Sequence, residues 1–393
     1  MIVTPKVRGF ICTTAHPTGC EENVRRQINY VKQQPRINGA KNVLVIGAST
    51  GYGLASRISS AFGCGASTIG IIFDKEASGN RTASAGWYNT AAFEKMAHAE
   101  GLYAKTINGD AFSKDIKSKT IELIKKDLGK IDLLIYSIAS PRRTNHEGET
   151  FSSVIKPIGN KYENKTIDLS TKMVSKVSVE PATEQEIEST IKVMGGEDWQ
   201  LWIDALSNAD VLAQGFDTIA YSYIGPELTH PIYLNGTIGM AKRDLKATSV
   251  NITKQLSSIK ASAYISVNKG LVTQASAAIP VVPLYISILY KIMKQKGIHE
   301  GCIEQIYRLY KDKLYADSRV LDDEGMLRID DLEMRSEIQQ YINEIWAVID
   351  NNNLNQVADI DGYWHDFYNL FGFGFENVDY EADVDIEVKI DSI

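Results

Sequence analysis

A glycine-rich turn directly follows an apolar run early in the chain and directly precedes a helical pattern. The apolar run is KNVLVI at 41–46, the turn is GASTGYG at 47–53, and the helical pattern continues to about Ala61. Glycines at GxxxGxG spacing permit a tight turn, close approach of the backbone to a pyrophosphate, and close packing of helix on strand. The helix N-terminus that follows offers free N–H groups and a positive dipole end. The turn predicts a dinucleotide-binding βαβ unit, with an ordinary tight turn as the alternative.

Short apolar runs and longer helical patterns alternate after this turn, which predicts βαβ crossovers and a parallel sheet. Strands are expected at 41–46, 68–73, 102–107, 131–137 and 264–267, and helices at 91–100, 113–128, 184–193, 199–212, 286–315 and 332–349. The polar stretch 141–181 is interpreted as an excursion over the surface, and the acidic tail 376–387 as a surface segment. The predicted fold is an α/β, Rossmann-like doubly wound parallel sheet with extra helices and surface insertions.

Composition excludes several classes of protein. The 393 residues are 44% hydrophobic and 23% charged, which is enough for a large core and argues against global disorder. A net charge of −7 disfavours a nucleic-acid-coating surface. The four cysteines have neither disulfide nor zinc spacing, no His or Cys pattern predicts a metal site, and no signal peptide is recognised. A cytoplasmic location is therefore expected.

One uncharged stretch, 270–290, has the length of a membrane span. It contains Gln274, Pro280 and Pro283, so it is interpreted as a buried strand end, a loop and a core helix. No transmembrane segment is predicted.

An aspartate at the end of the second strand bears on cofactor choice. Asp74 follows Gly53 by 21 positions (74 − 53) and can accept both adenosine ribose hydroxyls, which favours NAD over NADP. Lys75 and Arg81 lie nearby and could instead pair with a 2′-phosphate, and Asp74 could be a solvated turn residue. Residues after the third and fourth strands, at 109–111 and 137–140, belong to the edge where such sheets bind ligands.

Two tyrosine–lysine pairs are candidates for the electrophile that hydride transfer to a substrate requires. Tyr307 and Lys311 have the i, i+4 spacing of one helix face, but they follow the apparent late strand and are interpreted as structural. Tyr233 and Lys242 are half a turn out of phase on one regular helix. A helix that starts near Thr237, after an extended Tyr233, would let the lysine fold back toward the phenol. A buried tyrosine beside a surface lysine remains the alternative.

Further polar residues near these pairs have less specific interpretations. Tyr221 and Tyr223 lie upstream, where a second phenol could bind the same substrate oxygen or where a strand could simply alternate tyrosines. His230 is taken as structural. The pair Arg142–Arg143 either meets an acidic carrier or phosphate, or is a solvated loop.

Several longer stretches together carry a family resemblance. They are VIGASTGYGLASR at 45–57, AGWYN at 85–89, NGDAFS at 108–113, IYSIASPRR at 135–143, VMGGEDWQ at 193–200, IYLNGTIGMAKRDL at 232–245 and VTQASAAIPVVPLY at 272–285. With them the chain resembles, over nearly its whole length, the long bacterial NADH-dependent trans-2-enoyl-acyl carrier protein and trans-2-enoyl-CoA reductases, which are related to short-chain dehydrogenases. Such family members often carry Glu where this chain has Asp74; the shorter acid is expected still to exclude a 2′-phosphate.

The resemblance implies a set of site residues. Tyr233 is the proton donor or oxyanion partner, Lys242 binds the cofactor and Tyr223 contacts substrate. NADH is expected to contact Gly47, Ala48, Ser49, Thr50, Gly51, Tyr52, Gly53, Phe73, Asp74, Asp110, Ala111, Ile138, Ala139, Leu271, Val272 and Thr273. It also implies a single elongated domain, 1–393, with a dinucleotide-binding half at 41–140, a catalytic and substrate half at 141–285, and a helical extension at 286–393.

The implied function is NADH-dependent reduction of the 2,3-double bond of trans-2-enoyl thioesters in fatty acid synthesis. The substrate arrives on coenzyme A or on acyl carrier protein, and the chain is expected to act as a monomer. The alternative is an NAD(P)H-dependent β-ketoacyl thioester reductase that uses the same tyrosine and lysine.

Overall fold

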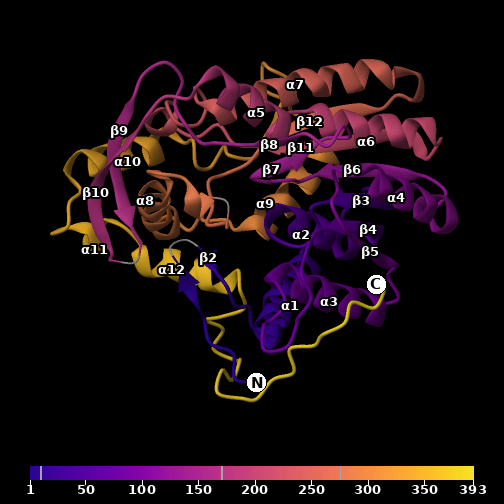
Figure 1. Ribbon diagram of the computed structural model, residues 1–393, viewed down its shortest axis with the longest axis horizontal. Coiled ribbons are helices and arrows are strands. Elements are labelled where there is room, and N and C mark those ends of the chain that lie inside the picture. The colour runs from indigo at the N-terminus through magenta and orange to yellow at the C-terminus, as the bar shows by residue number, and fades with distance from the viewer. Residues whose placement is uncertain (9–10, 170, 275) are drawn as a thin grey trace.

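The computed structural model describes residues 1–8, 11–169, 171–274 and 276–393. Its centre is a seven-stranded sheet with the strand order β13-β12-β11-β6-β3-β4-β5, in which every neighbouring pair is parallel (Figure 1). The strands are β1 (Val7–Arg8), β2 (Ile11–Cys12), β3 (Asn42–Ile46), β4 (Ser67–Ile72), β5 (Ala104–Asn108), β6 (Ile131–Tyr136), β7 (Arg142–Thr144), β8 (Thr150–Ser152), β9 (Tyr162–Asp168), β10 (Met173–Val179), β11 (Leu212–Ser222), β12 (Ser262–Val267) and β13 (Leu327–Arg328).

Helices connect and cover these strands. They are α1 (Pro17–Gln33), α2 (Gly51–Ile58), α3 (Ala85–Ala99), α4 (Lys114–Asp127), α5 (Glu184–Met194), α6 (Glu197–Asn208), α7 (Thr237–Gln255), α8 (Val282–Gln295), α9 (Cys302–Arg308), α10 (Ser336–Val348), α11 (Leu354–Val357) and α12 (Ile360–Asn369). The π-helical turns Ser59–Cys64 and Leu309–Leu314 continue α2 and α9. The predicted Rossmann-like class is confirmed.

Alternate side chains of the central strands feed two separate cores. Val43 and Val45 of β3 belong to a cluster that includes residues of α1, α2, α3, α8 and α9, whereas Leu44 and Ile46 belong to a second cluster with α4, α6 and α7. Because successive strand residues point to opposite faces, this split means that both faces of the sheet are buried. Burial on both faces explains why the strands are continuous apolar runs.

Several predicted boundaries of helices and strands are wrong. The helix expected through Ala61 changes to a π-helix at Ser59, and Leu212 begins β11 instead of ending a helix. The helix expected over 286–315 divides into α8, α9 and a π-helical turn, with Gly297 in the left-handed region (φ 66°) just past the end of α8. Helix α1 is an addition to the predicted elements, and its N-cap His16 accepts a hydrogen bond from the Gly19 N–H (3.2 Å).

Two peripheral segments behave as expected. The excursion over 141–181 forms the antiparallel hairpins β7–β8 and β9–β10. The acidic tail lies along α3 (Figure 1), where Tyr88 donates to the Ile386 carbonyl at 2.8 Å and Trp87 to the Val388 carbonyl at 2.7 Å. Most of 376–387 is exposed, with Val378 and Ile386 buried.

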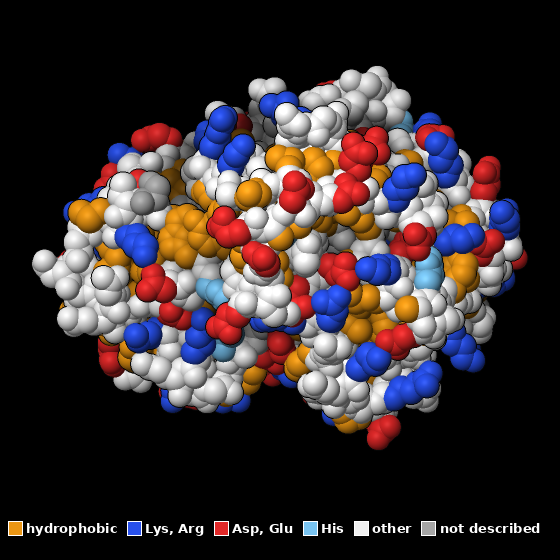
Figure 2. Space-filling view, turned by 90° about the horizontal axis from the view of Figure 1, so that it is seen from below, with side chains coloured by type: hydrophobic (Ala, Val, Ile, Leu, Met, Phe, Trp, Pro, Cys, Tyr) orange, Lys and Arg blue, Asp and Glu red, His pale blue; other side chains and the backbone are white. Residues whose placement is uncertain are grey.

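Charged side chains of both signs share one face of the molecule. On the face drawn in Figure 2, Lys and Arg lie interspersed with Asp and Glu among apolar side chains. Within the described residues, no helix has both the length and the apolar character needed to cross a bilayer.

Candidate active site

The glycine turn joins β3 to α2, and steric contacts require glycine at two of its positions. A Cβ on Gly53 would lie 1.8 Å from the Gly47 carbonyl oxygen, and a Cβ on Gly47 would lie 2.0 Å from the Ser137 carbonyl oxygen. Gly51 has φ +52° and open space around it. Thr50, the N-cap of α2, makes no side-chain capping bond. The first N–H groups of α2 therefore have no side-chain partner at the cap, which fits a pyrophosphate.

The sheet order reverses beside this turn. From β3 the chain builds β4 and β5 on one side and then β6, β11 and β12 on the other. In a parallel sheet all carboxyl ends lie at one edge, and ligands bind where the order reverses. The predicted cofactor positions after β3, β4, β5 and β6 are thus brought to one edge: 47–53, 73–74, 110–111 and 138–139.

Asp74 is half-buried at this edge, and its carboxylate has hydroxyl partners. Ser84 donates to Asp74 Oδ1 at 2.8 Å, and a Cβ on Gly86 would lie 2.4 Å from the same oxygen. Burial raises the pKa of Asp74, while hydrogen bonds from Ser49 and Ser84 act in the opposite direction. The neighbouring Phe73 is 79% exposed, which leaves its ring free to contact a base.

The Asp110–Ala111 segment is held by side-chain hydrogen bonds from residues that were not predicted to belong to the site. Lys117 Nζ and Trp202 Nε1 both donate to the Ala111 carbonyl, at 2.9 and 3.1 Å. Lys117 is itself buried and paired with buried Asp198 at 2.7 Å. Asp198 lies in the first turn of α6, and through Lys117 its carboxylate supports a segment 87 residues earlier in the chain (198 − 111).

Two phenols meet beyond the carboxyl end of β11. Tyr221 is the penultimate residue of that strand and Tyr223 lies just past its end. The rings of Tyr223 and Tyr233 are edge to face, with centroids 4.8 Å apart and planes at 89°. Tyr221 links this region to the glycine-turn helix, because its hydroxyl lies 2.6 Å from Ser56 Oγ of α2.

Tyr233 lies in the turn before α7, and that helix begins at Thr237 as predicted. A Cβ on Gly239 would lie 1.9 Å from the Leu234 carbonyl oxygen, so a glycine is needed for the turn to pack on the helix. Burial raises the pKa of Tyr233 to about 12. Its hydroxyl has no hydrogen-bond partner in the part of the chain that the structure describes, which leaves it available to a substrate oxygen.

Lys242 lies on α7 and points back toward the end of β11. Its Nζ donates to the Tyr221 carbonyl oxygen at 2.9 Å. Burial lowers the pKa of Lys242 to about 8. The Lys242 ammonium group therefore contacts the backbone of β11 at Tyr221, two residues before Tyr223 in the sequence.

The 271–273 segment, expected at the nicotinamide end, follows β12. Leu271 and Val272 are buried and Thr273 is half-buried. Tyr52 of the glycine turn donates through its hydroxyl to the Lys269 carbonyl at 2.8 Å. The Tyr52 side chain therefore ties the glycine turn to this segment.

The remaining polar candidates have other partners. Tyr307 is buried and donates to the Pro35 carbonyl at 2.6 Å while Lys311 is exposed, which agrees with their structural interpretation. His230 Nε2 lies 3.0 Å from the Gly225 carbonyl oxygen. Arg143 is buried and donates to the Lys192 carbonyl at 2.7 Å, so of the arginine pair only Arg142 is exposed to an acidic partner.

Three family models match the chain in succession. Residues 81–315 match the trans-2-enoyl-CoA reductase catalytic region and residues 2–79 match the NAD(P)H binding domain of trans-2-enoyl-CoA reductase. Residues 321–384 match an enoyl reductase FAD binding domain. The chain belongs to the trans-2-enoyl-CoA reductase family.

Named relatives agree with this membership. The chain is 61% identical over 394 residues to a trans-2-enoyl-CoA reductase [NADH] of Ruminiclostridium cellulolyticum, with 100% of both chains covered. It is 60% identical over 395 residues to an enoyl-[acyl-carrier-protein] reductase [NADH] of Flavobacterium johnsoniae, again with 100% of both covered.

Solved structures of this reductase family have the same fold. The Clostridium acetobutulicum trans-2-enoyl-CoA reductase in complex with NADH superposes with a TM-score of 0.97 at 45% identity, covering 99% of this chain and 100% of that one. The Treponema denticola trans-2-enoyl-CoA reductase in complex with NAD gives a TM-score of 0.94 at 48% identity, with 98% of each chain covered.

The part of this reductase that matches the FAD model does not form a flavin cradle. Residues 321–384, all of them described, form β13 and the helices α10, α11 and α12, and they contain no strand–glycine turn–helix unit like the one at 42–58. Ile338, Ile342, Tyr363 and Phe367 of this part are instead buried in the core shared with α8. No step of the reaction below passes through a flavin.

Proposed function

We propose that this trans-2-enoyl-CoA reductase family member uses NADH to reduce the 2,3-double bond of trans-2-enoyl thioesters. The observation that carries the proposal is the Tyr233 hydroxyl, which has no hydrogen-bond partner among the described residues and whose ring packs edge-on against Tyr223. These phenols lie beside β11, which the Ser56–Tyr221 contact joins to the glycine-turn helix.

Bound NADH supplies the hydride, which goes to the β-carbon of the acyl group. Negative charge would then develop on the thioester oxygen, and the α-carbon of the resulting enolate would take a proton from water to give the saturated product. We assign Tyr233 as the hydrogen-bond donor to that oxygen. A donor placed where charge develops contributes most in a site shielded from water. Lys242 is proposed to bind the cofactor through its ammonium group, which lies at the end of β11 beside the Tyr221 carbonyl.

The remaining site assignments follow the edge of the sheet. The glycine turn would hold the pyrophosphate. The adenosine would be contacted by Phe73, Asp74, Asp110 and Ala111. The nicotinamide end would be contacted by Ile138, Ala139 and the 271–273 segment. We further propose one catalytic unit with a dinucleotide half at 41–140, a substrate half at 141–285 and a covering extension at 286–393. We also propose that the chain acts as a monomer.

A β-ketoacyl reductase would use the same tyrosine and lysine, but the named relatives are enoyl reductases. NADH oxidation with crotonyl-CoA and with acetoacetyl-CoA separates the two. We expect turnover with crotonyl-CoA to exceed that with acetoacetyl-CoA by orders of magnitude. The reverse preference would refute the proposal. The same assay with an enoyl-acyl carrier protein shows whether the substrate arrives on coenzyme A or on acyl carrier protein.

We also propose a cytoplasmic location for the chain. Its four free cysteines are consistent with that location.

Replacing Asp74 by alanine is expected to narrow the preference for NADH over NADPH. The Asp74 carboxylate is proposed to accept hydrogen bonds from the ribose hydroxyls. A hydrogen bond to a charged group contributes about 1.5–3 kcal/mol, so its loss should raise KM for NADH by about 10- to 100-fold. The ratio of kcat/KM for the two cofactors is the measurement. Ser84→Ala removes a hydrogen bond to Asp74 but keeps the carboxylate, so it serves as the control. An unchanged ratio in Asp74→Ala would show that another residue selects the cofactor.

Affinity for NADH is expected to fall above about pH 8. Burial lowers the pKa of Lys242 to about 8, so its ammonium form prevails below that pH and is lost above it. If the ammonium contacts NADH, Kd rises by up to about tenfold per pH unit between pH 8 and 9.5. Fluorescence titration of NADH over this range measures the effect.

The Lys242→Arg variant distinguishes the effect of Lys242 on the pH dependence of NADH affinity from the effects of other groups that titrate in the same range. Burial lowers the pKa of Lys269 also to about 8, so both amines lose their proton in the same range. Arginine stays charged throughout, and we expect its Kd for NADH to be nearly independent of pH. A pH dependence that persists in Lys242→Arg would assign it to another residue.

A further inference from the structure

A fully buried carboxylate lies behind the candidate tyrosine pair. Glu333, in the segment between β13 and α10, has no exposed surface. Its Oε1 accepts hydrogen bonds from the hydroxyls of Tyr223 (3.0 Å) and Tyr285 (2.6 Å), and its Oε2 accepts from the Gly270 N–H (2.7 Å). The Glu333 side chain thus joins the C-terminal part of the chain to three other segments: the end of β11, the loop after β12 and helix α8.

Burial of a carboxylate is unfavourable unless donors and an opposite charge compensate it. Three donors are in place, and the buried ammonium of Lys269 lies beside the same loop, donating to the Gly270 carbonyl at 3.1 Å. Burial raises the pKa of Glu333, whereas Lys269 and the three hydrogen bonds oppose that shift. The Glu333 carboxyl group is therefore compensated by three hydrogen bonds, and removing it leaves three donors without their acceptor.

The hydrogen bond to Glu333 sets the direction of the Tyr223 side chain. With its hydroxyl turned to the carboxylate, Tyr223 presents its ring to Tyr233, 4.8 Å away between centroids. A Cβ on Gly270 would lie 3.2 Å from the Tyr223 hydroxyl and 3.4 Å from Glu333 Oε1. The loop backbone, the carboxylate and the phenol are thus packed against one another, so a displacement of one displaces the others.

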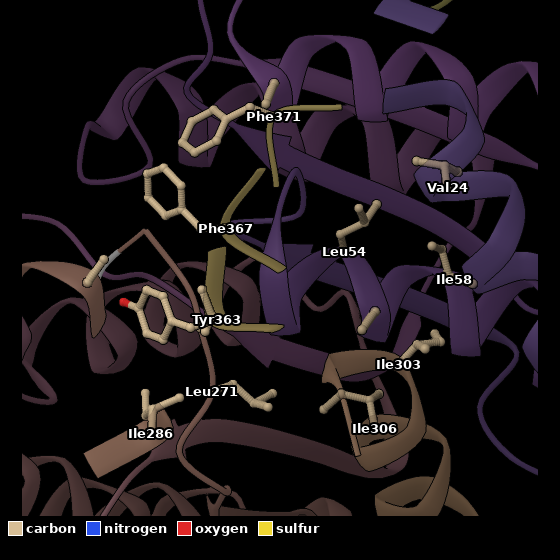
Figure 3. Close-up of a cluster of buried hydrophobic side chains, with 14 of the residues drawn as sticks. Val24, Leu54, Ile58, Leu271, Ile286, Ile303, Ile306, Tyr363, Phe367 and Phe371 are labelled. Carbon is tan, nitrogen blue, oxygen red and sulfur yellow. The ribbon is translucent and has the colours of Figure 1, made fainter. Parts of the chain in front are cut away.

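The loop after β12 depends on the C-terminal helices in the same way. Its backbone amides at Lys269, Gly270 and Val272 donate to Gln305 Oε1 (2.9 Å), Glu333 Oε2 (2.7 Å) and the Tyr290 hydroxyl (3.1 Å). The Leu271 side chain belongs to the cluster that includes Tyr363 of α12 and Ile306 of α9 (Figure 3). Side chains of α8, α9 and the 333 segment therefore fix the backbone of the loop that leads into the 271–273 segment.

We propose that Glu333 is a positioning residue for the reductase reaction. It holds the Tyr223 hydroxyl and the Gly270 amide in one geometry, and through them it orients Tyr233 and the 271–273 segment. The inference rests on the proposed function, because the reaction it serves is the reduction of enoyl thioesters. It assigns to the C-terminal part a role in the geometry of the site.

The test replaces Glu333 by glutamine and measures kcat, KM for crotonyl-CoA and Kd for NADH. Glutamine has the same size, but when its oxygen accepts from the Gly270 N–H its amide NH2 faces the Tyr223 and Tyr285 hydroxyls, which must reverse from donors to acceptors. We expect kcat to fall by about tenfold or more, with Kd for NADH within about threefold of the native value. The matched control is Glu94→Gln, a carboxylate that is equally buried, accepts from Thr106 and Ser392, pairs with Arg57 and contacts neither tyrosine of the candidate pair. The control should lower Tm and leave kcat within about twofold.

A double-mutant cycle with Tyr223→Phe distinguishes positioning from general destabilisation. If Glu333 acts through the Tyr223 hydroxyl, Glu333→Gln should reduce kcat far less in the Tyr223→Phe background than in the native chain. Equal reductions in both backgrounds would overturn the proposal, as would native kcat in Glu333→Gln.

Tyr285→Phe decides the case if Glu333→Gln does not fold. It removes one donor from Oε1 and leaves the carboxylate in place, and we expect a severalfold fall in kcat that depends on the Tyr223 hydroxyl in the same way. An unchanged kcat would refute the positioning role. The native enzyme is assayed in parallel: no crotonyl-CoA reduction by the native chain would refute the proposed function itself, whereas an active native chain with a fully active variant refutes only the role of Glu333.

Discussion

Replacing Tyr233 by phenylalanine is expected to lower kcat for crotonyl-CoA reduction by about 10²–10³-fold, the usual effect of removing one donor to a developing oxyanion. The substitution removes only the hydroxyl, which makes no hydrogen bond to any described residue, so the fold should be unaffected. Steady-state kinetics give kcat, and fluorescence titration should show native affinity for NADH.

Tyr307→Phe is the matched control for this substitution. It also removes one phenolic hydroxyl, but that hydroxyl donates to the Pro35 carbonyl at 2.6 Å, beside the end of α1. We expect Tyr307→Phe to lower Tm and to keep kcat near the native value. Near-native turnover in Tyr233→Phe would remove the phenol from the mechanism.

A methyl group on Gly53 is expected to damage the dinucleotide site more than one on Gly51. The Cβ of Gly53→Ala would lie 1.8 Å from the Gly47 carbonyl oxygen, so the turn must open. Overpacking of this kind costs about 1–3 kcal/mol or more, and we expect Kd for NADH to rise by about 10- to 100-fold. Fluorescence titration together with Tm measures both the binding and the stability.

Gly51→Ala provides the control within the same turn. Its Cβ would meet nothing within 4 Å, and only the φ of +52° opposes the substitution. A left-handed residue other than glycine costs about 1–2 kcal/mol, so Tm should fall modestly while NADH still binds. Equal losses of NADH affinity in both variants would indicate that the close approach of Gly53 to Gly47 is not what shapes the site.

The first half of the sheet is predictable from sequence because its signals are local. Apolar runs buried on both faces mark β3, β4 and β6, and the glycine turn marks the start of α2. The strand β11 was missed because Gln214, Gly215 and Asp217 interrupt its apolar pattern, and its pairing with β6 shifts register between Leu212 and Asp217. Asp217 is accommodated there by an ion pair with Arg319, which no local pattern reveals.

The candidate site was predictable where one segment supplies the chemistry. The glycine turn and the start of α7 follow from adjacent residues, whereas the roles of Tyr233 and Lys242 were implied by the family resemblance and remain predictions. Glu333 did not follow from adjacent residues, because its partners Tyr223 and Gly270 lie 110 and 63 positions away along the chain. Glu333 stands between Leu332 and Met334 with no motif around it, so only the packing of the folded chain shows that it is buried and hydrogen-bonded.

The most direct test of the central claim follows the hydride itself. NADH that carries deuterium at both C4 positions is incubated with crotonyl-CoA and the enzyme, and the product is analysed by mass spectrometry and NMR. We expect butyryl-CoA with one deuterium on the β-carbon. Butyryl-CoA without deuterium on that carbon would contradict hydride transfer to the enoyl group, as would no reduction of crotonyl-CoA while acetoacetyl-CoA in a parallel incubation is reduced to deuterated 3-hydroxybutyryl-CoA.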